Sequence, residues 1–133
     1  MTIKSNGAFL CDHFLIDTNG KSTLVGIFKN FNTPKLPTQI GRFYIVSFMH
    51  AEGLQNGNPI MSVVSFKIIG PDGKELKYKL PALPLKFSSE NKDALLSLEL
   101  NGFAFNEEGT YKFKIFEEEK MIVELELLVT LKK

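Results

Sequence analysis

The chain has 133 residues, of which 44% are hydrophobic and 23% charged, so it is too apolar for a disordered protein and has the size of one domain. Its 16 Lys and Arg against 15 Asp and Glu give a net charge of +1, which offers no electrostatic reason to expect a nucleic-acid or membrane partner. The single cysteine excludes an intramolecular disulfide, and residues 1–7 lack the apolar run of a signal peptide, so a cytoplasmic location is expected.

Short runs rich in Val, Ile, Phe and Leu recur between Gly, Asn and Pro clusters along the whole chain. This pattern predicts about eight or nine β-strands in a single domain covering residues 1–133. The first expected strand, residues 8–17, is unusual because both of its faces are apolar. Phe9, Cys11 and Leu15 point one way, and Leu10, Phe14 and Ile16 point the other.

The first two strands are expected to form a hairpin around Asp17 to Lys21. Two registers fit: either Asn19-Gly20 forms a two-residue turn, or Thr18-Asn19-Gly20 forms a three-residue loop with Gly20 in the left-handed conformation. We favour the second register, because it places Asp12 opposite Gly26, which has no side chain. Asp12 is then expected to be partly buried and to accept hydrogen bonds.

The middle of the chain is predicted to alternate strands with two crossovers that carry prolines. Pro34 and Pro37 exclude a central strand from residues 29–41, and residues 81–93 form the second crossover. Between them lie two expected strands, 42–50 and 59–69, and the first of these is again apolar on both faces. A sharp turn at Pro71-Asp72-Gly73 leads into residues 74–80.

Three expected strands in the last third alternate apolar and polar residues, so each has one buried and one wet face. Their inward positions are Leu96, Leu98 and Leu100, then Tyr111, Phe113 and Ile115, and finally Val123, Leu125, Leu127 and Val129. The parity of the last two strands allows Lys114 to face Glu124 and Lys112 to face Glu126 across the sheet.

One short motif indicates the fold more specifically. Gly109, Tyr111 and Phe113 match the corner of immunoglobulin-like sandwiches, where a Tyr enters a strand two residues before a core Cys and its hydroxyl binds the preceding loop. Here Phe113 takes the position of that Cys. The motif and the strand count together favour an all-β fold, an immunoglobulin-like antiparallel β-sandwich, over a closed barrel.

The chain also resembles, over nearly its full length, a family of small bacterial proteins of uncharacterised function. The matching residues are Leu10-Cys11-Asp12, Gly20-Lys21, Leu24-x-Gly26-Ile27-Phe28, Pro71-Asp72-Gly73 and Gly109-x-Tyr111. The opening hairpin pattern is the most distinctive part. The resemblance implies a β-sandwich and a bacterial or phage source, and it transfers no catalytic residue.

The sequence favours no catalytic or metal site and implies no cofactor. Cys11, Asp12 and His13 look like a nucleophile, an acid and a base, but Asp12 projects to the opposite face of the strand from the other two. Cys11 and His13 would need further ligands to hold a metal, and the only other histidine is His50. The aspartates lie in separate predicted segments, which argues against a calcium site. We therefore expect the protein not to be an enzyme.

The second apolar face of the first hairpin suggests an interface. Cys11, His13, Leu15, Val25 and Ile27 share this face, and no helix is predicted to cover it. Three alternatives remain for what covers this face: the crossover 29–41 with Phe31, Leu36 and Ile40 as plugs, a second copy of the chain, or a different protein.

Two functions from different classes follow. The leading one is a non-enzymatic interaction module that contacts a partner through a sheet face or a strand edge and self-associates. The alternative is a small-ligand or carbohydrate binder that uses the loops at residues 52–58 and 88–93. Those loops contain no aromatic residue to stack on a sugar, which favours the interaction module.

Overall fold

The computed structural model describes residues 2–55 and 59–132, and within them the protein is built from β-strands. The strands are β1 (Thr2–Ile16), β2 (Ser22–Ile27), β3 (Asn30–Thr33), β4 (Thr38–Glu52), β5 (Ile60–Ile69), β6 (Leu83–Phe87), β7 (Asp93–Phe105), β8 (Gly109–Glu117) and β9 (Lys120–Leu131). Across these described ranges, no helix is long and apolar enough to span a membrane.

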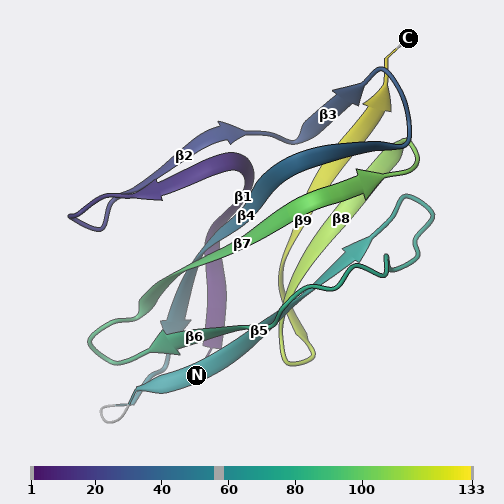
Figure 1. Cartoon of the computed structure of the whole chain (residues 1–133). Helices are drawn as coiled ribbons and strands as arrows, with labels where there is room; N and C mark the ends of the chain where they lie inside the picture. Colours follow the sequence, from purple (N-terminus) through teal and green to yellow (C-terminus); the bar gives the residue numbers. More distant parts are fainter. Residues whose placement is uncertain (1, 56–58, 133) are drawn as a thin grey trace.

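The strands form two sheets that pack face to face, one in the order β2-β1-β4-β7 and the other in the order β3-β9-β8-β5-β6 (Figure 1). All neighbours pair antiparallel except β3 and β9, which pair parallel. Strands β1, β4 and β7 hold the places of strands A, B and E of an immunoglobulin domain, and β5, β8 and β9 hold those of C, F and G. The fold is an immunoglobulin-like β-sandwich, as the sequence predicts.

Aromatic rings from both sheets interlock in the centre of the core. The ring centroids of Phe103 and Phe105 of β7 lie 4.9 Å apart, and the ring centroid of Phe105 lies 4.9 Å from that of Tyr111 of β8. Phe43 of β4 meets Phe113 of β8 at 6.1 Å. All five side chains are buried. Edge-to-face packing of this kind stabilises a core beyond the area it buries.

The alternation expected in the last third is confirmed. Leu96, Leu98, Leu100, Ile115, Leu127 and Val129 are buried together with Tyr111 and Phe113, and Val123 and Leu125 are partly buried against the same core. On the outer face, Lys112 pairs with Glu126 in register, and the Lys114 ammonium lies 3.7 Å from the Glu124 carboxylate. The outer surface of β8 and β9 is therefore charged and faces the solvent.

The two proline-bearing crossovers differ from the prediction, since each contains a short strand and the first also contains the start of the central strand β4, at Thr38 directly after Pro37. Strand β6 tolerates Pro84 because it lies at the edge of its sheet, where a missing N–H breaks no central ladder. Strand β3 ends at Thr33, immediately before Pro34. Both are too short and too irregular in sequence to be identified from periodicity.

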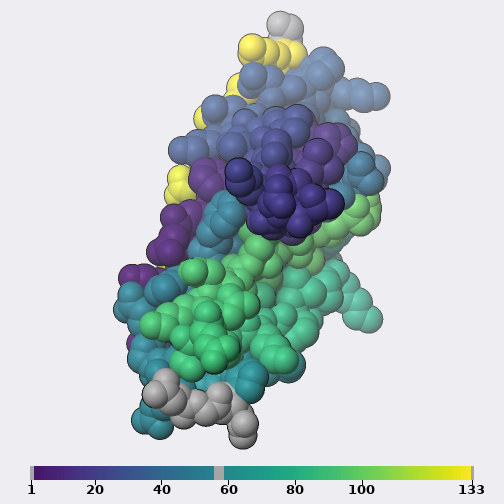
Figure 2. Space-filling view, turned by 90° about the vertical axis from the view of Figure 1, so that its left-hand side faces the viewer, coloured from purple at the N-terminus to yellow at the C-terminus, as the bar shows by residue number. Residues whose placement is uncertain are grey.

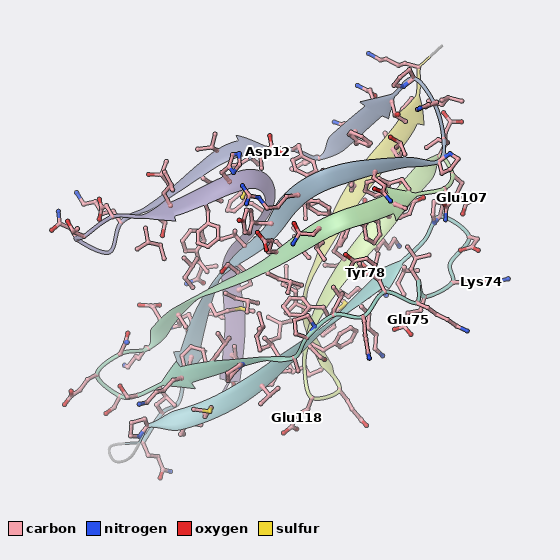
Figure 3. All side chains as sticks on the ribbon, viewed as in Figure 1. Asp12, Lys74, Glu75, Tyr78, Glu107 and Glu118 are labelled. Atoms are coloured by element: carbon pink, nitrogen blue, oxygen red, sulfur yellow. The ribbon has the colours of Figure 1, made fainter. Side chains whose placement is uncertain are left out.

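Residues 74–80, in contrast, form no strand and touch β5 through a single bridge between Glu75 and Ile69. Within this segment, Tyr78 contacts β7 of the other sheet (Figure 3). Its hydroxyl donates to the Asn101 carbonyl at 2.8 Å, and its ring lies 5.1 Å from that of Phe103. This segment thus lies against β7 rather than extending the sheet of β5.

The tyrosine corner is confirmed. The Tyr111 hydroxyl donates to the Glu107 carbonyl at 2.9 Å and accepts from the Glu107 N–H at 3.3 Å. Gly109 has a φ of +130°, and a Cβ at this position would lie 2.6 Å from the Cβ of Pro71. The corner therefore needs glycine both for its backbone conformation and for its contact with the Pro71 turn.

We predict that Tyr111→Phe destabilises the fold by about 1–3 kcal/mol, because the substitution leaves the two Glu107 backbone groups without their partner. The measurement is the free energy of unfolding in urea. Tyr78→Phe is the matched control, since it also removes a hydroxyl bonded to backbone but at an exposed site. A loss for Tyr111→Phe no larger than that for Tyr78→Phe would contradict a structural role of the corner.

Candidate interaction surface

The opening hairpin leaves the body of the sandwich. Strand β1 pairs with β4 from Thr2 to Cys11 and with β2 from Cys11 to Ile16. After Cys11, β1 no longer pairs with β4 and pairs only with β2. We call this part of the hairpin, residues 12–27, the arm. The arm extends sideways from the two sheets in Figure 1, and in Figure 2, which looks at that side, its residues stand toward the viewer.

The tip of the arm is a tight three-residue loop held by one carboxylate. The Asp17 side chain accepts from the backbone N–H of Asn19 at 2.8 Å and of Lys21 at 2.9 Å. The Gly20 N–H donates to the Asp17 carbonyl, and Gly20 has a φ of +79°. An aspartate before the turn and a glycine at its left-handed position are the residues this loop requires.

The register with Asp12 opposite Gly26 is confirmed, since the ladder pairs Cys11 with Ile27 and His13 with Val25 on either side. Gly26 has a φ of +68°, and a Cβ there would lie 3.0 Å from the Asp12 carboxyl carbon. The expected burial of Asp12 is wrong: its side chain is exposed (Figure 3). The arm has already left the body at this position, so no second layer covers the carboxylate.

The base of the arm is anchored by an aromatic and a polar contact to β4, and Arg42 of β4 in turn contacts Glu99 of β7. The Phe14 ring meets the Tyr44 ring edge-on at 5.1 Å. The Arg42 guanidinium lies 3.5 Å from the His13 imidazole and 3.7 Å from the Glu99 carboxylate. These contacts fix the position of the arm relative to the outer surface of its own sheet.

Hydrogen bonds hold Glu99 as a carboxylate beneath the arm. Glu99 accepts from the Asn101 amide at 3.0 Å and from the Tyr44 hydroxyl at 2.9 Å, and these bonds lower the pKa of Glu99 below its ordinary value of 4.5. The same hydroxyl bond raises the pKa of Tyr44. The stabilisation from Glu99 is thus fully present above pH 4.5 and is lost as the pH falls through its lowered pKa.

Four large apolar side chains of the arm are exposed. Leu15, Val25 and Ile27, which share the face predicted for the interface, are 62%, 46% and 52% exposed, and Ile16 on the opposite face of the arm is 55% exposed. His13 is exposed as well. The prediction that Cys11 belongs to the same patch is wrong. Its side chain is completely buried at the base of the arm, so it cannot contact a partner.

The crossover does not plug this patch. Phe31, Leu36 and Ile40 are partly buried, but they pack against the main core, and the Phe31 ring lies 5.6 Å from the core residue Phe105. The plug expected as one alternative is therefore wrong. Strand β3 carries Phe31 to the opposite sheet by pairing with β9, which directs the crossover away from the arm.

Few of the described side chains are arranged as a nucleophile or as metal ligands. Burial raises the pKa of the Cys11 thiol, with a smaller contribution from the Asp12 charge, so the thiol is protonated at neutral pH. His50 lies at the far end of β4, 2.7 Å from Asp93 and 3.9 Å from Glu52. Within residues 2–55 and 59–132, no group of three or more His, Cys, Asp or Glu side chains converges to hold a metal ion.

Of the two loops proposed for a small ligand, only residues 88–93 contribute, through Ser88 and Asn91, to a shallow depression of about 330 Å³. Its lining residues are Pro59, Lys86, Phe87, Ser88 and Asn91. Phe87 is buried in the core, so its ring is not presented to a sugar. Residues 56–58 of these loops lie outside the described residues.

A family model described as a family of unknown function, DUF6941, matches residues 6–130. No curated protein matches the chain in sequence. Among solved structures, the chain is similar to the alkylpurine DNA glycosylase AlkC of Pseudomonas fluorescens bound to DNA containing an abasic-site analogue, with a TM-score of 0.54, 11% identity, and coverage of 92% of this chain and 30% of that one.

The chain is also similar to a β-glucosidase from Listeria innocua, with a TM-score of 0.52, 9% identity, and coverage of 98% of this chain and 16% of the enzyme. An immunoglobulin-like protein from Pseudomonas aeruginosa matches 97% of both chains with a TM-score of 0.40 and 14% identity. The chain thus spans less than a third of the two larger proteins, and at these identities the likeness concerns the fold alone.

We predict that Gly26→Ala destabilises the protein by about 1 kcal/mol more than Gly20→Ala. Both glycines are left-handed, so each alanine costs roughly 1–2 kcal/mol in the backbone, but only Gly26 also faces a side chain, that of Asp12. Urea denaturation measures both values. In an Asp12→Ala background the difference between the two variants should disappear, and its persistence would contradict the Asp12 contact.

We also predict that Tyr44→Phe raises the pKa of Glu99 toward 4.5, because the carboxylate loses one of its two hydrogen-bond donors. An NMR titration of the glutamate carboxyl carbons measures the shift. Glu52 is the control, since Lys4 lowers its pKa independently of Tyr44. An unchanged Glu99 titration would show that the Tyr44 hydroxyl does not contribute.

Proposed function

The chain belongs to this family of unknown function, and we propose that it is a non-enzymatic protein-interaction module that self-associates through the arm. The contact uses either the apolar face of the arm or the edge of β2. The proposed role needs no cofactor, metal ion or nucleic acid. A cytoplasmic location is part of the proposal, because a single buried cysteine is compatible with a reducing compartment.

The observation that carries the proposal is the concentration of exposed apolar side chains on the arm. In the part of the chain that the structure describes, nine large hydrophobic side chains are exposed, and four of them belong to the arm. Single exposed apolar residues are ordinary on a protein surface, but a cluster on a projecting element marks a contact site.

A second copy of the chain is the partner that needs the fewest assumptions, because a two-fold contact requires only one self-complementary patch. A standard interface buries roughly 800 Å² on each partner, which is about a tenth of the 8230 Å² surface of this chain. The cost of association offsets much of the free energy gained by burying such an area. We therefore expect a dissociation constant in the micromolar range rather than a very tight dimer.

Light scattering over a range of concentrations tests the proposal. The mass should rise from one chain toward two as concentration increases. Leu15→Lys should raise the dissociation constant at least about tenfold, because it places a charge in the contact. Leu15 is exposed in the single chain, so the substitution should leave the free energy of unfolding nearly unchanged.

Met61→Lys is the matched control, since Met61 is equally exposed but lies on β5 in the other sheet. It should leave the dissociation constant within about twofold of the wild-type value. A wild type that stays monomeric at millimolar concentration would overturn self-association, and equal effects of the two variants would move the contact away from the arm.

A further inference from the structure

We propose that two copies of the chain exchange their arms, so that each arm lies on the outer face of the partner subunit's β2-β1-β4-β7 sheet instead of on its own. This inference rests on the proposed function and names the surface of the second copy that receives the arm. The observations that support it are an apolar cluster on that outer face, the contact of the arm with it and an interruption at the hinge of the arm.

The outer face of the sheet that carries the arm has a small apolar cluster of its own. Ile45 belongs to the main core, so Val46, the next residue of β4, points to the outer face. Its partner across the ladder is Phe9 of β1, and the Phe9 ring meets the Phe48 ring edge-on at 6.5 Å. Cys11 lies two residues after Phe9 on the same face. Val46 and Cys11 are both completely buried although they point away from the main core.

The arm lies against this outer face at its base and at its tip. At the base, the Phe14 ring meets the outward-pointing Tyr44 ring at 5.1 Å. At the tip, Gly20 and Ser22 line a depression of about 260 Å³ together with Leu95 of β7. Three side chains on this side of the arm are half-buried: Phe14, Ser22 and Leu24. The arm therefore forms a third layer, which stands in front of the sheet in Figure 2 and leaves space beneath its tip.

The hinge of this layer lies at Asp12 and Gly26. The ladder between β1 and β2 skips this pair and continues on both sides of it, and Gly26 has a left-handed backbone with a φ of +68°. A break in the ladder at a glycine lets both strands change direction there. Beyond the hinge, the arm is a hairpin closed by the Asp17 carboxylate, so it can swing as a unit and keep its internal hydrogen bonds.

The outer face already binds an arm of this sequence in the single chain, which makes the arm of a second copy its best-fitting partner. Exchange preserves these contacts, because the same residues meet again between two chains. Two arms that cross a two-fold axis also pass each other near their hinges. This brings the exposed Val25 and Ile27 of both copies together. Only this new contact and the hinge favour the dimer over two closed chains, which agrees with micromolar rather than tight association.

Cross-linking of two single-cysteine variants tests the exchange. One chain carries Ser22→Cys at the tip of the arm and the other carries Leu95→Cys on the outer face, while Cys11→Ala in both leaves one thiol per chain. Circular dichroism checks that both fold. At concentrations where light scattering shows two chains, a short bismaleimide should link the mixed variants into a covalent dimer, because Ser22 and Leu95 line the same depression.

Each variant treated alone is the control, since it lacks one of the two thiols and should stay a single chain on a denaturing gel. A mixture that gives no more covalent dimer than the separate variants, although light scattering shows a dimer, would overturn the exchange and keep self-association. A wild-type chain that is monomeric at every concentration overturns both this inference and the proposed function.

A pair of glycine substitutions tests the hinge by light scattering. Gly26→Val should lower the dissociation constant at least about tenfold, because a β-branched residue disfavours the left-handed backbone of the closed arm and favours an extended hinge. Gly20→Val is the matched control: Gly20 is also left-handed, with a φ of +79°, but it lies in the tip loop, which exchange leaves unchanged. Its dissociation constant should stay within about twofold of the wild-type value. An unchanged or higher dissociation constant for Gly26→Val contradicts the exchange.

Discussion

Strand β1 changes its pairing partner from β4 to β2 at Cys11, and the rest of the molecule depends on this change. Cys11 is the last residue of β1 paired with β4, through Tyr44, and also the first paired with β2, through Ile27. The residue is fully buried between these two ladders. A small apolar side chain suits a position that is covered from both sides, and beyond it the strand has only β2 to pair with. The arm exists because the ladder with β4 ends there.

A two-stranded ribbon is marginally stable by itself in water. Contacts at the tip and at the base must therefore hold the arm in its conformation. The Asp17 carboxylate and the left-handed Gly20 close the tip, and the Phe14 ring on Tyr44 holds the base. Between these ends the apolar side chains gain little from their own chain. Under the proposed self-association, contact with a second copy would give these side chains neighbours and would help to order the arm.

Alternation and turn chemistry were sufficient to predict the body of the sandwich and the register of the arm. The inward residues of β7 to β9, the tyrosine corner and the pairing of Asp12 with Gly26 all follow from local patterns. The exposure of Asp12 does not, because a period of two residues shows which side chains share a face but not whether a second layer covers that face. The same limit explains why Cys11 was placed among exposed residues.

The destination of the crossover could not be predicted for a different reason. Phe31, Leu36 and Ile40 are equally suited to an apolar face of either sheet, and only the parallel pairing of β3 with β9 decides between them. Parallel pairing between segments far apart in sequence leaves no local signature. Strand β6 could not be predicted because a proline such as Pro84 argues against a strand everywhere except at the edge of a sheet.

The burial of Cys11 also makes the opening of the arm measurable through the reactivity of its thiol. The chain holds one sulfhydryl, and it is sealed at the root of the arm. An alkylating reagent in solution can consume it only when that root opens, so the labelling rate at high reagent concentration equals the opening frequency and at low concentration reports the opening equilibrium. The labelling rate of the unmodified protein therefore measures how often its first hairpin detaches from β4.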